Sequence, residues 1–141
     1  MSADLSSYVS SNGERFEQEL VEFLAIPSVS TESGFEEEVT RCAEWLADEI
    51  RAAGMDNVEI IPTDGNPFVV GETIVDADAP TLLVYGHYDV QSVDPIELWE
   101  SPPFEPDIRN GRIYARGTND DKGQVHMHIK ALETRLRGGF G

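Results

Sequence analysis

The stretch from Thr81 to Gly123 decides the fold, and it contains two polar pieces, Gly86-His87-Tyr88-Asp89-Val90 and Gly117-Thr118-Asn119-Asp120-Asp121-Lys122-Gly123. The unbroken apolar run Leu82-Leu83-Val84-Tyr85 precedes the first piece and predicts a strand buried on both faces of a sheet. A histidine and a carboxylate follow its carboxyl end, where open α/β sheets bind ligands. Arg112-Ile113-Tyr114-Ala115 predicts another strand before the second piece. The two loops can therefore face one crevice.

The rest of the chain predicts helices on either side of short strands. Apolar residues recur at helical spacing in residues 14–26 and 35–53 and again from Gly123 onward, and Gly54 is well placed to end the second helix. Ser33 and Glu36 have the spacing of a capping box at the start of that helix. Further strands are predicted at 58–61, 68–74 and 81–85. This order indicates a layered α/β arrangement.

The charge balance is strongly acidic, with 27 Asp and Glu residues against 10 Lys and Arg and a formal net charge of -17. Of the basic residues only Lys122 and Lys130 are lysines. A surface this acidic repels nucleic acid and anionic lipid, which argues against both as partners. It suits a protein kept soluble in concentrated salt, where screening removes self-repulsion. We therefore hypothesise an extreme halophile as the source.

Cys42 is the single cysteine, so no intrachain disulfide can form and a reducing compartment is expected. Its place in a helical apolar stripe favours a buried structural thiol over a nucleophile. The first dozen residues show no secretory signal, and no apolar run reaches membrane-spanning length. A cytoplasmic protein is the expectation.

The candidate site residues are His87 and Asp120 as metal ligands, and Asp89 beside them. A neutral imidazole is a good zinc ligand, and a carboxylate bonded to its other ring nitrogen would fix the tautomer, a role open to Asp89. Asp120 and Asp121 could supply anionic ligands to a two-metal site. The alternatives are a loop histidine beside a turn aspartate, and an aspartate pair capping the next helix, with Lys122 as ordinary surface charge.

Other polar and aromatic groups have simpler explanations. His126 and His128 flank the apolar stripe of the last helix, which disfavours metal binding. The three glutamates 36–38 fit a solvated first helical turn better than a carboxylate cluster. Trp99 and Phe104 could line a substrate pocket, but anchoring of the long segment between Gln91 and Gly111 is favoured.

Taken together, these motifs resemble the di-zinc metallopeptidases, a family that includes carnosinase and other dipeptidases, glutamate carboxypeptidase, aminoacylase, acetylornithine deacetylase and succinyl-diaminopimelate desuccinylase. Several spaced motifs in one order make the resemblance specific, and it covers nearly the whole chain. The motifs are Ile26-Pro27-Ser28-Val29-Ser30, Gly86-His87-Tyr88-Asp89-Val90-Gln91, Trp99, Pro103-Phe104-Glu105-Pro106, Gly111-Arg112-Ile113-Tyr114-Ala115-Arg116-Gly117 and Asp120-Asp121-Lys122-Gly123.

The resemblance implies a layered α/β/α fold with a mixed sheet, of the phosphorylase/hydrolase-like kind, and a metal-dependent hydrolase of peptide or N-acyl amino acid substrates. His87 matches a zinc ligand, Asp89 the catalytic aspartate that orients it, and Asp120 the carboxylate that bridges two zinc ions. Cobalt or manganese could replace zinc. The Asp120-Asp121 bond matches a peptide that the family holds cis. Gln91 with the tryptophan and Pro-Phe-x-Pro segment looks more like the dipeptidase branch than the desuccinylase branch.

The sequence departs from the family pattern in ending early. The Glu-Glu pair that supplies a general base, another acidic ligand, a late histidine and an inserted dimerisation domain are all expected further downstream. Residues 1–141 then correspond to the amino-terminal part of a catalytic domain, with a homodimer expected for the full-length protein. Two alternatives stay open: a truncated, non-catalytic fragment, and a dead-enzyme interaction module.

Overall fold

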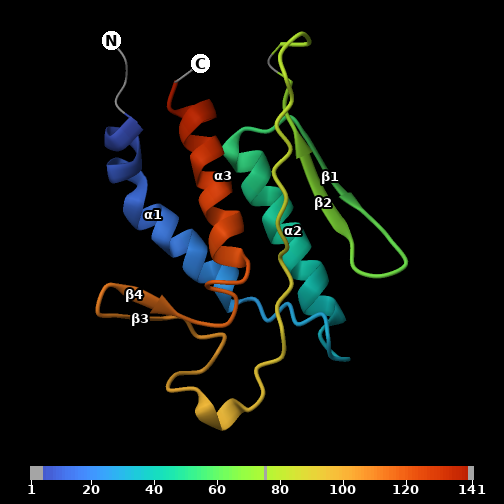
Figure 1. The fold of residues 1–141 in the computed structure, drawn as a ribbon, viewed down its shortest axis with the longest axis vertical. Coiled ribbons are helices and arrows are strands. Elements are labelled where there is room, and N and C mark those ends of the chain that lie inside the picture. The colour runs from blue at the N-terminus through green and yellow to red at the C-terminus, as the bar shows by residue number, and fades with distance from the viewer. Residues whose placement is uncertain (1–4, 75, 140–141) are drawn as a thin grey trace.

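The computed structural model describes residues 5–74 and 76–139, and its largest elements are three helices. They are α1 (Leu5–Ala25), α2 (Glu36–Ala53) and α3 (Lys122–Arg137). Figure 1 shows α3 between α1 and α2, with a hairpin on the far side of α2. None of the described helices is apolar enough over a sufficient length to cross a membrane.

The predicted helices are all present, with changes at their ends. The first is longer than expected, because it already begins at Leu5. Gly54 ends α2 as predicted, in the left-handed conformation with φ 111°. The predicted capping box is wrong: Phe35 is the N-cap, so Ser33 lies too far upstream to cap the helix. Glu36 instead accepts a hydrogen bond from the Gly34 N–H at 2.9 Å.

Two hairpins hold all the strands that the described residues form. β1 (Asn57–Ile61) pairs with β2 (Phe68–Glu72), and β3 (Asp107–Arg109) pairs with β4 (Arg112–Tyr114); both pairs are antiparallel. A short 3-10 helix, η1 (Ile96–Leu98), precedes β3. β3 lies within the long segment between Gln91 and Gly111, where no strand was predicted, and it is too short, with three paired residues, to leave a sequence pattern.

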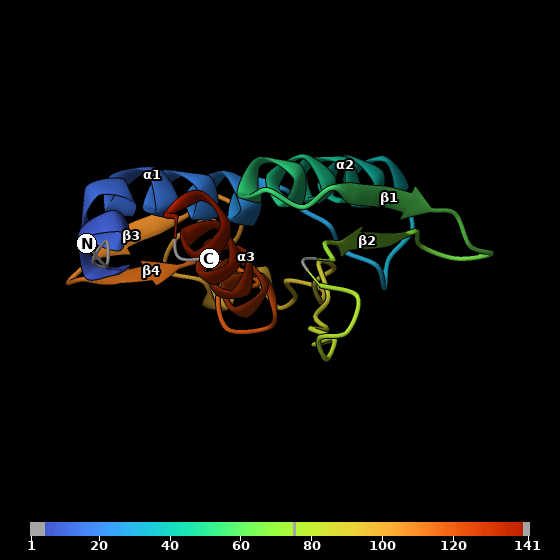
Figure 2. The same cartoon turned by 90° about the horizontal axis from the view of Figure 1, so that it is seen from above.

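The predicted buried strand at 81–85 is wrong. The segment belongs to no sheet, and Leu82, Leu83 and Tyr85 are more than 80% exposed (85%, 87% and 81%). It is a coil that crosses in front of α2 in Figure 1, and Figure 2 shows it on the β2 side, apart from α2. A buried central strand needs strands at both edges and cover on both faces, which no part of 5–74 and 76–139 provides. The predicted layered α/β/α fold with a mixed sheet is therefore replaced by helices with two separate two-stranded antiparallel sheets.

The hydrophobic core lies where the end of α1 meets α2 and α3. The rings of Phe23 and Trp45 stack with their centroids 4.6 Å apart. Cys42 is fully buried in this core, as predicted, and burial raises the pKa of its thiol. Tyr88 joins the core from the segment that carries His87. The loop with the candidate histidine is therefore packed against the helices.

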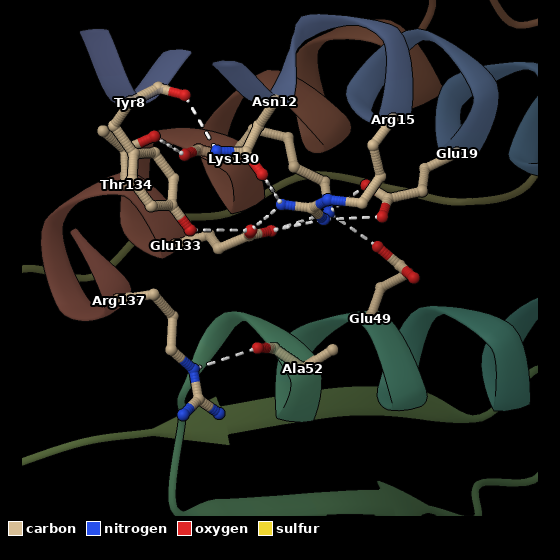
Figure 3. A network of polar contacts seen from close by, with 10 residues as sticks. All are labelled: Tyr8, Asn12, Arg15, Glu19, Glu49, Ala52, Lys130, Glu133, Thr134 and Arg137. Carbon is tan, nitrogen blue, oxygen red and sulfur yellow. Dashed lines mark hydrogen bonds and ion pairs between the residues drawn. The ribbon is translucent and has the colours of Figure 1, made fainter. Parts of the chain in front are cut away.

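A network of charged side chains joins all three helices (Figure 3). Lys130 contacts three carboxylates, with its Nζ 2.6 Å from Glu19, 2.7 Å from Glu49 and 3.0 Å from Glu133. Arg15 of α1 also pairs with Glu133, whose side chain is 5% exposed. These contacts fix α3 against both neighbouring helices.

Candidate metal centre

His87 is oriented by the residues that follow it. Its Nδ1 lies 3.1 Å from Asp89 Oδ1 and 3.1 Å from the Asp89 carbonyl oxygen. Asp89 is itself held by the Ser30 hydroxyl, which donates to Asp89 Oδ2. A proton on Nδ1 satisfies these acceptors and leaves the Nε2 lone pair of the neutral imidazole available to a ligand.

Asp120 comes from the second polar loop and meets the free edge of this imidazole. Its Oδ1 lies 3.0 Å from His87 Nε2. The side chains are 41% exposed for His87 and 77% exposed for Asp120, so both can be reached from solvent. The structure thus brings together all three predicted site residues, His87, Asp89 and Asp120, from loops 33 residues apart.

The carboxylates stabilise a charged His87 ring. Partial burial lowers the pKa of His87, but hydrogen bonds to Asp89 and Asp120 outweigh burial and raise that pKa above its usual value. A positive ion at Nε2 would have to displace the proton that this ring shares with Asp120. Ion binding here should therefore strengthen as pH rises.

Asp121 does not act as a simple helix cap. It is the N-cap residue of α3, yet its side chain caps no backbone N–H of that helix. Its Oδ2 instead accepts a hydrogen bond from the His87 N–H at 3.0 Å. The Asp120-Asp121 peptide is cis, as the resemblance implies. Gly86 permits this contact, since an added Cβ would lie 2.9 Å from Asp121 Oδ2.

Lys122 is completely buried, contrary to the alternative that made it surface charge. Its Nζ donates to the carbonyl oxygens of Phe23 and Ile26 at 2.8 and 2.6 Å. Burial lowers the pKa of this ammonium to about 8. The residue after the aspartate pair therefore points down to the end of α1, while Asp120 points to His87.

The other polar candidates lie apart from this pair. His126 is buried, and its pKa is lowered to about 4, chiefly by burial and also by Lys130. His128 is exposed on α3, and the glutamates 36–38 stand at the start of α2 with Glu36 and Glu37 exposed. None of these side chains contacts His87 or Asp120 in any contact found for the described residues.

Asp120 is one of the residues that line an open groove of about 1220 Å³. It lies between the segment around η1 and the β3–β4 hairpin. Trp99 lines it and anchors its wall, because its indole N–H donates to the Val93 carbonyl at 2.9 Å and the Arg116 guanidinium lies 5.1 Å from its ring. Trp99 is thus a loop anchor, as favoured, and also a groove residue.

The donor set fits one zinc ion as a partial site. Zinc bonds of about 2.0–2.2 Å at tetrahedral angles place two ligand atoms roughly 3.3 Å apart, close to the separation of His87 Nε2 and Asp120 Oδ1. Within the described ranges no group of three or more His, Cys, Asp or Glu side chains is placed to hold a metal ion. These residues alone therefore offer two ligands, fewer than a closed zinc site requires.

Sequence reasoning missed three supporting contacts. No sequence pattern predicts that Ser30 contacts Asp89, that Asp121 accepts the His87 N–H, or that Lys122 is buried against the end of α1. For Lys122 the sequence offers one signal, which is the rarity of lysine. The chain has only two lysines, and the structure buries both Lys122 and Lys130. For Ser30 no sequence pattern points 59 residues ahead to Asp89.

Comparison with known proteins agrees with this geometry. The sequence profile of peptidase family M20/M25/M40 matches residues 83–140, the segment that carries His87 and Asp120. The cysteinylglycine-S-conjugate dipeptidase of Corynebacterium striatum is 34% identical over 91% of this chain. The chain belongs to the M20/M25/M40 peptidase family.

The proteins similar to this chain include both dipeptidases and desuccinylases. The succinyl-diaminopimelate desuccinylase of Delftia acidovorans is also 34% identical, over 82% of this chain. Human carnosine dipeptidase 1 has a similar fold, with a TM-score of 0.85 and 27% identity over 94% of this chain. This M20-family chain spans 28%, 29% and 30% of the lengths of these three proteins.

Proposed function

We propose that this chain supplies the first two ligands, His87 and Asp120, of the zinc centre of an amide-bond hydrolase that acts on dipeptides. The observation that carries the proposal is the 3.0 Å approach of His87 Nε2 to Asp120 Oδ1, made by two loops that the family profile spans. The dipeptidases among the similar proteins support a peptide substrate, and N-acyl amino acids are the related class supported by the desuccinylase.

Each residue of the centre has a separate task. His87 and Asp120 would hold the ion, and Asp89 would keep the proton of His87 on Nδ1 so that Nε2 stays a ligand. Bound zinc supplies a Lewis acid that polarises an amide carbonyl and activates water. The groove lined in part by Asp120 gives an extended substrate a path to this position.

A non-catalytic role is the second candidate, and one observation favours it. The two ligands are not joined by a third suitable side chain among the residues that the structure describes. Catalysis by the polypeptide of residues 1–141 would also need a general base within reach of the ion. In this candidate the polypeptide binds zinc weakly and hydrolyses nothing.

Zinc titration and a hydrolysis assay separate these candidates. We expect calorimetric zinc binding that is abolished in His87→Ala and strongly weakened in Asp120→Asn, while the exposed His128→Gln leaves it unchanged. Zinc binding that survives both site substitutions would overturn the proposed centre. Hydrolysis of Cys-Gly or β-alanyl-histidine by the zinc-loaded polypeptide would favour the enzyme, and zinc binding without hydrolysis would favour the non-catalytic candidate.

A further inference from the structure

Both lysines of this chain are buried, but different groups surround their ammonium ions. Lys130 is surrounded by three carboxylates. Lys122 is 0% exposed, and no ion pair joins it to any described carboxylate. Its ammonium instead contacts two backbone carbonyl oxygens and lies 5.0 Å from the centre of the Phe23 ring. A buried cation with no carboxylate partner needs a specific structural reason.

The carbonyls that Lys122 binds are at the end of α1. The last carbonyls of a helix have no partner within the helix and carry the negative end of its dipole. The last turn of α1 contains no basic residue of its own. Lys122 supplies the missing cation from α3, with donor distances of 2.8 Å to Phe23 and 2.6 Å to Ile26.

The stem of Lys122 passes against the loop that carries Asp120. A Cβ added to Gly117, at the start of that loop, would lie 3.3 Å from Lys122 Cδ. The loop closes over the first turn of α3, where the Gly123 N–H donates to the Gly117 carbonyl at 3.4 Å. Moving the ammonium would therefore move the loop above it.

The same end of α1 also leads into the residues that hold His87. The Ser28 hydroxyl donates a hydrogen bond to the Tyr88 carbonyl at 2.7 Å, and the Ser28 backbone carbonyl accepts one from the Val90 N–H at 2.9 Å. Ser30 holds the Asp89 carboxylate. The segment just after α1 thus fixes the His87 loop, and Lys122 fixes the Asp120 loop to that same point.

We propose that Lys122 is a positioning residue that sets the separation of His87 and Asp120 by fixing the loop of Asp120 to the carboxyl end of α1. The inference rests on the proposed function in one respect: it assumes that this pair binds a metal ion. It concerns the geometry of the two loops, which can also be observed without metal.

The test compares Lys122→Met with Lys130→Met. Methionine keeps most of the buried stem of lysine and removes all of its donors, and Lys130 is equally buried but lies in the other network. Two quantities are measured on folded protein: zinc affinity by competition with a chromogenic chelator, and hydrogen exchange of the His87 amide, which donates to Asp121. Lys122→Gln is measured alongside, since it keeps one amide donor and disturbs the fold less.

We expect Lys122→Met to weaken zinc binding on the order of 10-fold to 100-fold and to speed exchange of the His87 amide, with a smaller effect for Lys122→Gln. Lys130→Met should leave zinc affinity near its wild-type value. In each variant, exchange of the His87 amide is compared with exchange of core amides, which separates a local effect at His87 from the general destabilisation expected for Lys130→Met. Wild-type zinc affinity and His87 exchange in a folded Lys122 variant would overturn the inference, as would equal effects of the two methionine variants. Absence of zinc binding in the wild type overturns the proposed function instead, and the exchange measurement then still decides the role of Lys122.

Discussion

The backbone N–H of His87 donates a hydrogen bond to the carboxylate of Asp121 at 3.0 Å. The contact joins the two candidate metal loops through a residue that is not itself a proposed ligand. Asp120 and Asp121 are neighbours in sequence, and both of their carboxylates contact His87. One holds its ring, and the other holds its backbone.

Replacing Asp121 should loosen His87 without removing a ligand. In Asp121→Ala the His87 N–H loses its acceptor, so we expect faster amide exchange at His87 and zinc binding weakened on the order of 10-fold. Asp121→Asn keeps an acceptor oxygen and serves as the matched control, with both quantities near wild type. Equal loss in the two variants would show that the charge of Asp121, not its hydrogen bond, is what matters.

The buried His126 should make the fold sensitive to mild acid. Its pKa is lowered to about 4 in the folded state, against an ordinary value of about 6.5. A lowered folded-state pKa means that the unfolded chain binds the proton first, so stability is fully present above pH 6.5 and is lost as pH falls toward 4. The groups that face His126 are Lys130, Glu19, Glu133 and Arg15, and burial is the largest cause.

Urea unfolding at pH 6.5 and pH 5 measures this effect. We expect the wild type to lose about 1.5 kcal/mol from His126 over that interval. His87 acts in the opposite direction, because its raised pKa favours the folded state below pH 6.5. Comparison with His126→Gln cancels the His87 contribution, which both proteins share. A wild-type pH dependence no steeper than that of His126→Gln would contradict the assignment.

Removing the Lys130 ammonium should destabilise the fold, mainly because it leaves buried carboxylates without a cation. In Lys130→Met the carboxylates of Glu19, Glu49 and Glu133 lose their shared cation, and breaking a buried pair costs about 3–5 kcal/mol. Arg41→Gln is the control: its pair with Glu38 is solvent-exposed and should be worth less than about 1 kcal/mol. Chemical unfolding of both variants at pH 7 gives the comparison. Similar losses for the two would mean that Arg15 alone compensates Glu133.

Local patterns in the sequence predicted the helices well, because each helix buries a stripe at its own spacing. Gly54 ended α2 where predicted, and Cys42 was buried as its stripe position required. The strand at 81–85 failed for a different reason. An apolar run shows that a segment suits a buried strand, but burial depends on partners elsewhere, and the described residues place none beside Leu82 and Leu83.

The sequence singled out the three candidate residues that the structure brings together, but not the residues that support them. His87, Asp89 and Asp120 stood out because their residue types match zinc chemistry and follow strand-like runs. Ser30 and Lys122 act through contacts 59 and more than 90 residues away in sequence. Such contacts depend on how α1 ends against the two loops, which no local pattern records.

The distribution of lysine leads to the last prediction. Both lysines are buried, so the cations on the described surface are arginines, in a chain with a formal net charge of -17. Self-repulsion among the acidic side chains should destabilise the fold at low ionic strength, where the Debye length is about 30 Å at 0.01 M salt, and molar salt shortens it to about 3 Å. We therefore expect the melting temperature to rise by more than about 10 °C between 0.01 M and 2 M KCl. A series at constant osmolality, in which sorbitol replaces part of the KCl, separates screening from water exclusion. A melting temperature independent of KCl would remove the basis for a halophilic source.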